Sequence, residues 1–148
     1  MAISVSHHGE YLMKTNDQTT EPGCVNGSPL GLLRIEGLFV FILSIFLYSR
    51  SGASWWLFAL LLLVPDLSMT GYWLGARAGA MAYNAVHTYA GPLLLIGLAL
   101  AGSHANWLPY GLIWSTHIGM DRGLAYGLKY PGTFKSTHLG WLGARTAK

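Results

Sequence analysis

Residues 30–48 read LGLLRIEGLFVFILSIFLY, a stretch whose charged residues, Arg34 and Glu36, both stand near its start. A helix needs about 20 predominantly apolar residues to cross a lipid bilayer, and this stretch is close to that length. Three further apolar segments of similar length follow at residues 55–74, 78–102 and 107–127. The sequence therefore predicts four membrane-crossing helices.

The composition of the whole chain also indicates a membrane protein. Of its 148 residues, 52% are hydrophobic and only 10% are charged, whereas about a quarter of the residues in a soluble domain are charged. Intrinsic disorder is excluded for most of the chain, because disorder requires low hydrophobicity and high charge. The net charge of +3 is too small and too scattered for a nucleic-acid-binding protein. The single cysteine, Cys24, excludes an internal disulfide framework.

The predicted fold class is all-α, an integral membrane bundle of four antiparallel helices with a short C-terminal cytoplasmic cap. Short connections between the apolar segments force neighbouring helices to run antiparallel. Pro65 and Pro92 are expected to kink the helices in which they stand. We divide the chain into a mobile polar tail at residues 1–29, a four-helix transmembrane domain at residues 30–127 and a C-terminal cap segment at residues 128–148.

Positively charged residues predict the orientation of this bundle, because Lys and Arg concentrate in cytoplasmic loops. Four crossings place both termini on the same side of the membrane. The opposite side carries Arg50 alone, whereas the side of the termini carries Lys14, Arg34, Arg77, Arg122, Lys129, Lys135, Arg145 and Lys148. Both termini are therefore predicted to be cytoplasmic.

The polar side chains of the four segments fall in one half of the predicted bundle. Because neighbouring segments run in opposite directions, their polar ends all meet in the cytoplasmic half, and the outer half is apolar. A charged side chain at the bilayer centre costs about 2.5 to 3.5 kcal/mol on insertion scales, so such groups face inward and pair. We expect one polar pocket there, which gathers Arg34, Glu36, Asp66, Asp121 and Arg122.

Four residues of this pocket are assigned catalytic roles: Asp66, His87, His117 and Asp121. Histidine is the side chain best suited to proton transfer near neutral pH, and a carboxyl group in a low-dielectric setting can act as an acid. Helical spacing places Trp114 on the same face of the last segment as His117 and Asp121. The residues assigned to substrate binding are Tyr83, Asn84, Tyr72, Trp114, Tyr126, Arg34, Glu36 and Arg122.

Several short motifs are distributed over residues 32–140. They are RIEG at 34–37, SWWLF at 54–58, PDLSM at 65–69, YN at 83–84, HTY at 87–89, HIG at 117–119, DR at 121–122, YGLKY at 126–130 and THLG at 137–140. With these motifs the chain resembles a bacterial family of small integral membrane proteins that is known as a domain of unknown function. The resemblance implies four transmembrane helices, located in the bacterial inner membrane, and implies no particular reaction.

The pocket is interpreted as the active site of an intramembrane enzyme that performs acid/base chemistry on a lipophilic small molecule by hydrolysis, isomerisation or cyclisation. The expected partners are this molecule and membrane lipids, a homo-oligomer is left open, and no nucleic acid is expected. No cofactor and no metal ligand is assigned. Two alternatives stay open. One is a metal-binding oxidoreductase that uses the four catalytic residues, with or without His138, and the other is a proton-coupled binding or transport protein.

Overall fold

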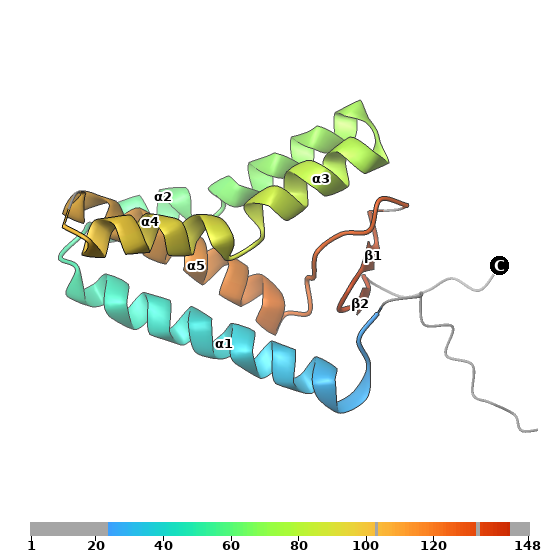
Figure 1. Cartoon of the computed structure of the whole chain (residues 1–148), viewed down its shortest axis with the longest axis horizontal. Coiled ribbons are helices and arrows are strands. Elements are labelled where there is room, and N and C mark those ends of the chain that lie inside the picture. Colours follow the sequence, from blue (N-terminus) through green and yellow to red (C-terminus); the bar gives the residue numbers. More distant parts are fainter. Residues whose placement is uncertain (1–23, 103, 133, 143–148) are drawn as a thin grey trace, which may run out of the picture.

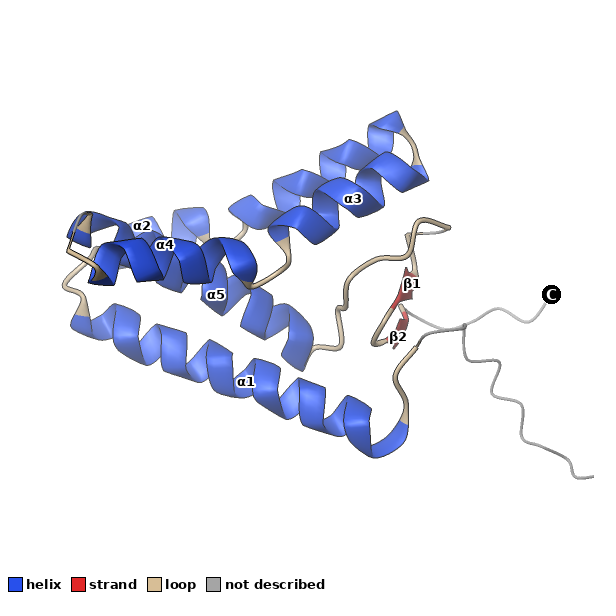
Figure 2. Cartoon of the chain, in the orientation of Figure 1, coloured by secondary structure: helices blue, strands red, loops and turns tan. Residues whose placement is uncertain are grey.

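The computed structural model describes residues 24–102, 104–132 and 134–142. Most of the predicted tail, residues 1–23, and the end of the predicted cap, residues 143–148, lie outside the described residues, and with them Lys14, Arg145 and Lys148. The described chain is mostly helical, with a small β-hairpin near its C-terminal end (Figure 2). The prediction of a helical protein is therefore confirmed, and the hairpin is an addition to it.

The elements follow one another along the chain as labelled in Figure 1. The α-helices are α1 Gly27–Arg50, α2 Trp55–Leu61, α3 Ala76–Val86, α4 Ala90–Leu100 and α5 Leu108–Gly123, and the 3-10 helices are η1 Val64–Leu74 and η2 Ala105–Trp107. Two short strands, β1 Ser136–Thr137 and β2 Gly140–Trp141, pair antiparallel, with Ser136 opposite Trp141 and Thr137 opposite Gly140. Asn26 precedes α1 in an extended conformation.

Two helical stretches of the described chain are long and apolar enough to cross a membrane, by length and composition. The first is α1, and the second is Trp55–Leu74, which combines α2 with η1. Few of their side chains are buried inside the protein, since only about a tenth of each apolar stretch or less is covered. Most of their surface is therefore apolar and faces outward.

The segment expected as one helix at residues 78–102 forms two helices, so the prediction of a continuous helix there is wrong. α3 ends at Val86 and α4 begins at Ala90. Pro92 lies in the first turn of α4, where a backbone N–H has no partner within the helix. Pro65 likewise lies in the first turn of η1. Both prolines therefore begin a new element instead of kinking an existing one.

Helix α5 lies between α1 and α4 and packs against both of them, while η1 packs against α3 (Figure 1). Most residues of α5 from position 111 onward are buried. Tyr48 near the end of α1 forms a small apolar core with Leu112 and Ile113 of α5. α5 is therefore the central helix, and side chains on it are held by neighbours on several sides.

Helices α1 and α5 approach so closely that their crossing requires a glycine. A Cβ atom on Gly119 would lie 2.8 Å from the carbonyl oxygen of Gly37 and 2.7 Å from the backbone nitrogen of Phe41. These are backbone atoms, so neither can move aside unless α1 shifts as a whole. The contact therefore fixes the position of α5 relative to α1.

The chain after α5 returns toward α3 and forms the hairpin. Lys129 and Thr137 pair as an isolated antiparallel bridge, and the Val25 amide donates a 2.8 Å hydrogen bond to the carbonyl oxygen of His138. In Figure 1 the hairpin lies beyond the C-terminal end of α5, close to the beginning of α1. The first contact holds the C-terminal segment together, and the second connects it to the residues just before α1.

Candidate functional site

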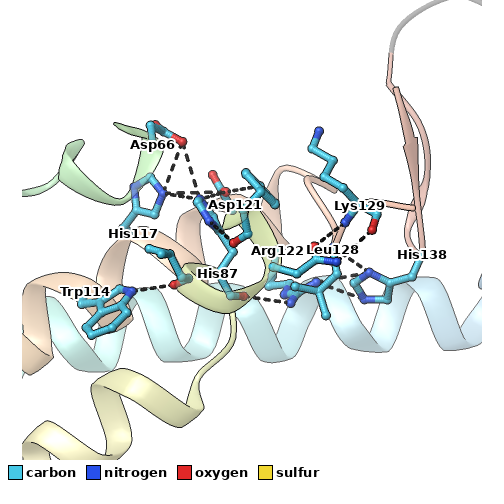
Figure 3. A network of polar contacts seen from close by, with 12 residues as sticks. Asp66, His87, Trp114, His117, Asp121, Arg122, Leu128, Lys129 and His138 are labelled. Atoms are coloured by element: carbon cyan, nitrogen blue, oxygen red, sulfur yellow. Dashed lines mark hydrogen bonds and ion pairs between the residues drawn. The ribbon is translucent and has the colours of Figure 1, made fainter. Parts of the chain in front are cut away.

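Two histidines and two aspartates converge on one position at the centre of the described chain (Figure 3). They are Asp66, His87, His117 and Asp121, and each offers a nitrogen or oxygen atom that lies within 4.8 Å of the corresponding atoms of the other three. We call this group the His/Asp cluster. It consists of the four residues that the sequence assigns to catalysis.

The distances within the His/Asp cluster are short and similar. The Nε2 atoms of His87 and His117 lie 3.1 Å apart. Asp66 Oδ1 lies 3.6 Å from each of these nitrogens, and Asp121 Oδ2 lies 3.6 Å from His87 Nε2 and 3.8 Å from His117 Nε2. Four donors at about 2.0 to 2.1 Å from a tetrahedral zinc ion would be about 3.4 Å apart. The cluster therefore has the dimensions of a four-coordinate metal site.

Three separate elements supply the cluster. His117 and Asp121 are four residues apart on α5, so their side chains lie on the same face of that helix. His87 directly follows the last residue of α3. Asp66 lies in the first turn of η1, directly after Pro65. The two breaks in the predicted helices therefore place His87 and Asp66 at element ends, where they can approach α5.

The ring of His87 has a defined orientation and tautomer. Its Nδ1 lies 2.9 Å from the carbonyl oxygen of Tyr83, and a carbonyl oxygen only accepts, so in this contact Nδ1 is the protonated nitrogen. The neutral ring then presents the lone pair of Nε2 to the cluster. The ring also stacks on that of Tyr83, with centroids 3.6 Å apart. A metal-binding histidine typically has this arrangement, with its second nitrogen donating to a carbonyl group.

His117 is fully buried, with an exposed fraction of 0%. Its Nε2 faces the cluster, while its Nδ1 has no hydrogen-bond partner among the described residues. Asp121 is held differently, because its Oδ2 accepts a 3.0 Å hydrogen bond from Tyr83 Oη. Tyr83 therefore supports the cluster twice, through the carbonyl contact with His87 and through this bond.

The cluster is enclosed on most sides and open at Asp66. His87 is 2% and Asp121 9% exposed, whereas 37% of the Asp66 side chain is exposed. A molecule that reaches the cluster from outside therefore meets Asp66 first. An apolar cavity of about 400 Å³ is lined among others by Pro65, Val86 and Trp114. Pro65 and Val86 directly precede Asp66 and His87 in the chain, so this cavity adjoins the elements that carry the cluster.

Arg122 connects the cluster with the C-terminal segment. Its Nη2 donates a 3.3 Å hydrogen bond to the carbonyl oxygen of His87, and its Nη1 lies 3.0 Å from His138 Nε2. The Leu128 amide donates a 2.8 Å hydrogen bond to His138 Nδ1. Burial lowers the pKa of His138, and the neighbouring guanidinium group of Arg122 lowers it further. The His138 ring is therefore neutral over a wider pH range than an exposed histidine.

Asn84 fixes the C-terminal segment to α3. Its side chain donates a 2.9 Å hydrogen bond to the Lys129 carbonyl oxygen and accepts a 2.7 Å bond from the Lys129 amide. The Lys129 ammonium group lies 4.3 Å from the ring centroid of Phe134 and 5.1 Å from that of Tyr83. Burial lowers the pKa of Lys129, and the nearby carboxylates of Asp121 and Asp66 act in the opposite direction. Lys129 is thus a buried cation beside the cluster.

The other residues assigned to substrate binding lie at different distances from the cluster. Tyr83, Asn84 and Arg122 adjoin it, as described above. Trp114 lies next to it, because its indole N–H donates a 2.7 Å hydrogen bond to the carbonyl oxygen of Val86. Arg34 donates to the Gly123 carbonyl oxygen at the end of α5 instead.

Three assigned residues face other surroundings. The Tyr72 ring contacts that of Phe134, Tyr126 is 44% exposed, and Glu36 lines a separate cavity with Arg122 and His138. Lys129 was not among the assigned site residues. Its position in the YGLKY motif, at the beginning of the predicted cap segment, is the signal in the sequence from which it could have been found.

Comparisons with known proteins give one match. A family model with the description "Domain of unknown function (DUF4260)" matches residues 31–142. The resemblance stated from the sequence motifs is confirmed at the level of a family of unknown function. No curated protein and no solved structure matches the chain. The matched region contains all four residues of the His/Asp cluster, together with Arg122, Lys129 and His138.

Proposed function

Since this chain belongs to the DUF4260 family, whose description assigns no reaction, we propose a function from the geometry of its own residues. The chain is an integral membrane protein in which the His/Asp cluster binds one divalent transition-metal ion. The metal site is the active site of an enzyme that acts on a lipophilic small molecule. This reverses the order of preference drawn from the sequence, in which the metal centre was the alternative.

The observation that supports the metal ion best is the convergence of four donor atoms from three elements. Two imidazole nitrogens and two carboxylate oxygens are a donor set that suits zinc, iron or manganese. The tautomer of His87 agrees with this role, because its Nε2 lone pair faces the other donors while Nδ1 is held by Tyr83. A bound cation would also offset the charges of the two Asp carboxylates, of which that of Asp121 is buried.

The chemistry of such a site depends on its open edge. A bound ion supplies Lewis acidity and lowers the pKa of a coordinated water. Asp66 is the most exposed donor, so its carboxylate would be the group best placed to exchange a proton with a substrate or water, while His87, His117 and Asp121 would hold the ion from the buried side. The adjacent apolar cavity suits a lipophilic substrate, because its lining includes Val64, Pro65, Val86 and Ile113. Hydrolysis, isomerisation and cyclisation all remain compatible with this arrangement.

Metal content tests the proposal directly. Protein purified in detergent without chelators should carry about one equivalent of a first-row transition metal. The variants His87→Ala and His117→Ala should each retain less than about a tenth of that amount. His104→Ala is the matched control, because His104 is exposed and stacks on Trp107 away from the cluster. Metal-free wild-type protein, or equal metal content in all three variants, would contradict the proposal.

A second candidate is an acid/base enzyme without a metal. It is favoured by the 3.1 Å separation of the two Nε2 atoms, which is a hydrogen-bond distance, so a single proton can be shared between His87 and His117. The two candidates predict different protonation states. Nitrogen-15 NMR should find both Nε2 atoms unprotonated if they bind an ion, and one of them protonated if they share a proton.

The orientation in the membrane is proposed from the positive residues. Lys and Arg are concentrated at the side of the termini, so the end of α4 lies outside and the hairpin lies in the cytoplasm. In a Cys24→Ser background, Ala101→Cys should react with a membrane-impermeant thiol reagent added to intact cells, and Lys135→Cys should not. Both sites are exposed on the protein surface. The reverse labelling pattern would overturn the orientation.

A further inference from the structure

A long groove runs between α1 and α4, with α5 as its floor. Its volume is about 620 Å³, and its walls are mainly leucine side chains of α1 and α4. Leu43 and Leu47 of α1 line one side, Leu93 and Leu100 of α4 line the other, and Ser115 of α5 lies at the bottom. The groove is thus mainly apolar, with side chains of α1 and α4 on its two sides.

The groove continues into a polar cavity at the end near the hairpin. This second cavity has a volume of about 350 Å³ and is lined by Glu36, Arg122 and His138, among others. Val40 and Tyr89 line both cavities, so the two adjoin each other. The combined site runs along α1 from Leu33 to Arg50, a length of about 25 Å at 1.5 Å per residue.

Two polar atoms inside the groove lack partners in the described part of the chain. They are Tyr89 Oη and Ser115 Oγ, both of which are buried, and Ser115 as a residue is only 3% exposed. Leaving a buried hydroxyl group without a hydrogen bond is unfavourable, and native proteins usually provide a partner. Both residues line the groove, so the polar atoms of a ligand bound near the polar end are candidate partners for these hydroxyl groups.

The polar end carries one acidic and one basic side chain that are not paired with each other in the described part of the chain. Within the described residues, Glu36 and Arg122 line the same cavity yet form no ion pair, and the contacts of Arg122 are to the His87 carbonyl group and the His138 ring. Arginine presents a planar set of donors that matches a phosphate group. A free carboxylate such as that of Glu36 matches an ammonium group.

We propose that this groove binds one zwitterionic phospholipid. An acyl chain lies between α1 and α4, the phosphate faces Arg122, and the ammonium group of the head faces Glu36. An acyl chain reaches about 15 Å, half of the hydrocarbon core of a bilayer, which fits the apolar part of the groove. No residue of the His/Asp cluster is among the described residues that line either cavity, so the lipid site is separate from the proposed metal site.

Native mass spectrometry with defined lipids tests this proposal. The detergent-purified chain is incubated with equal amounts of a phosphatidylethanolamine and a phosphatidylglycerol that have identical acyl chains. We expect one lipid per chain, with the zwitterionic lipid preferred. Leu43→Trp, which fills the groove from a half-exposed position on its wall, should reduce lipid retention about tenfold. Ile42→Trp is the matched control, because Ile42 is exposed on α1 and lies outside the groove lining.

A second variant tests the head group independently of the groove. Glu36→Gln changes an exposed residue, so the fold should be retained, and the preference for phosphatidylethanolamine over phosphatidylglycerol should be lost. Equal lipid retention in Leu43→Trp and Ile42→Trp would overturn the proposal. An unchanged preference in Glu36→Gln would overturn the assignment of the head group. A dimer that Leu43→Trp dissociates would also overturn it, since the groove would then be filled by a second copy of the chain.

Discussion

Tyr83 Oη on α3 donates a 3.0 Å hydrogen bond to Asp121 Oδ2 on α5, and both residues are almost completely buried. A partner that orients a metal-binding carboxylate typically changes metal affinity by about 10- to 100-fold when it is lost. Tyr83→Phe should therefore weaken metal binding by about this factor while retaining the ring that stacks on His87. Competition with a chromogenic chelator measures the change. Tyr126→Phe, at an exposed position, is the control, and an equal loss in both variants would contradict the role of Tyr83.

Asn84→Ala should loosen the C-terminal segment. It removes the two hydrogen bonds between the Asn84 side chain and the Lys129 backbone, which together are worth about 1 to 3 kcal/mol. Amides of residues 128–142 should exchange with deuterium about 5 to 160 times faster, while α1 and α5 change little. Asn106→Ala at an exposed position of η2 provides the comparison. Unchanged exchange in Asn84→Ala would show that this contact does not hold the segment.

Gly119→Ala should destabilise the packing of α1 against α5. The new Cβ would lie within 3.0 Å of backbone atoms of Gly37 and Phe41, and overpacking of this kind typically costs about 1 to 3 kcal/mol. Gly97→Ala on α4 is the matched control. The space around Gly97 is open, so this change should be neutral or stabilise α4 by up to about 1 kcal/mol through its higher helix propensity. Thermal unfolding in detergent measures both, and the same shift in both variants would contradict a close crossing.

The stability of the C-terminal segment should fall as the pH drops below about 6.5. In the unfolded chain His138 takes up a proton near its ordinary pKa of 6.5, whereas burial and Arg122 lower its pKa in the folded segment. The unfolded state therefore binds more protons in this range, and the free energy of unfolding decreases with falling pH. Hydrogen-exchange protection factors of residues 128–142 at pH 7.5 and pH 5.5 measure it. His138→Gln should remove this pH dependence, and an equal dependence in the variant would assign it to another group.

Much of the helical architecture could be predicted from the sequence, because an apolar segment of about 20 residues has few stable conformations other than a helix. Residues 30–48 lie within α1, and 107–127 contain α5. The positions of Pro65 and Pro92 were read as kinks, since proline removes a hydrogen bond inside a helix. Whether a proline kinks a helix or begins a new one depends on how the surrounding helices pack, here α3 and α5. The spacing of apolar residues in the sequence carries no information about that packing.

The members of the His/Asp cluster could also be predicted, because charged and titratable side chains in apolar segments face the interior of the protein and pair with one another. The close approach of their four donor atoms could not. Asp66, His87 and His117 stand on separate elements and lack the fixed spacing of a metal-binding motif, so only the fold brings their donor atoms together. The same holds for Lys129, whose ammonium group reaches Tyr83 through the return of the C-terminal segment.

The division of the His/Asp cluster among η1, the end of α3 and α5 has a consequence for how the protein is made. A ribosome completes Asp66 and His87 well before His117 and Asp121, so during synthesis the first two side chains are present without their partners. The cluster can close only after α5 has packed against the earlier elements. An ion bound by the cluster, as proposed above, would connect η1 and the end of α3 with α5, the last α-helix of the described chain, and would be captured only once these elements have come together.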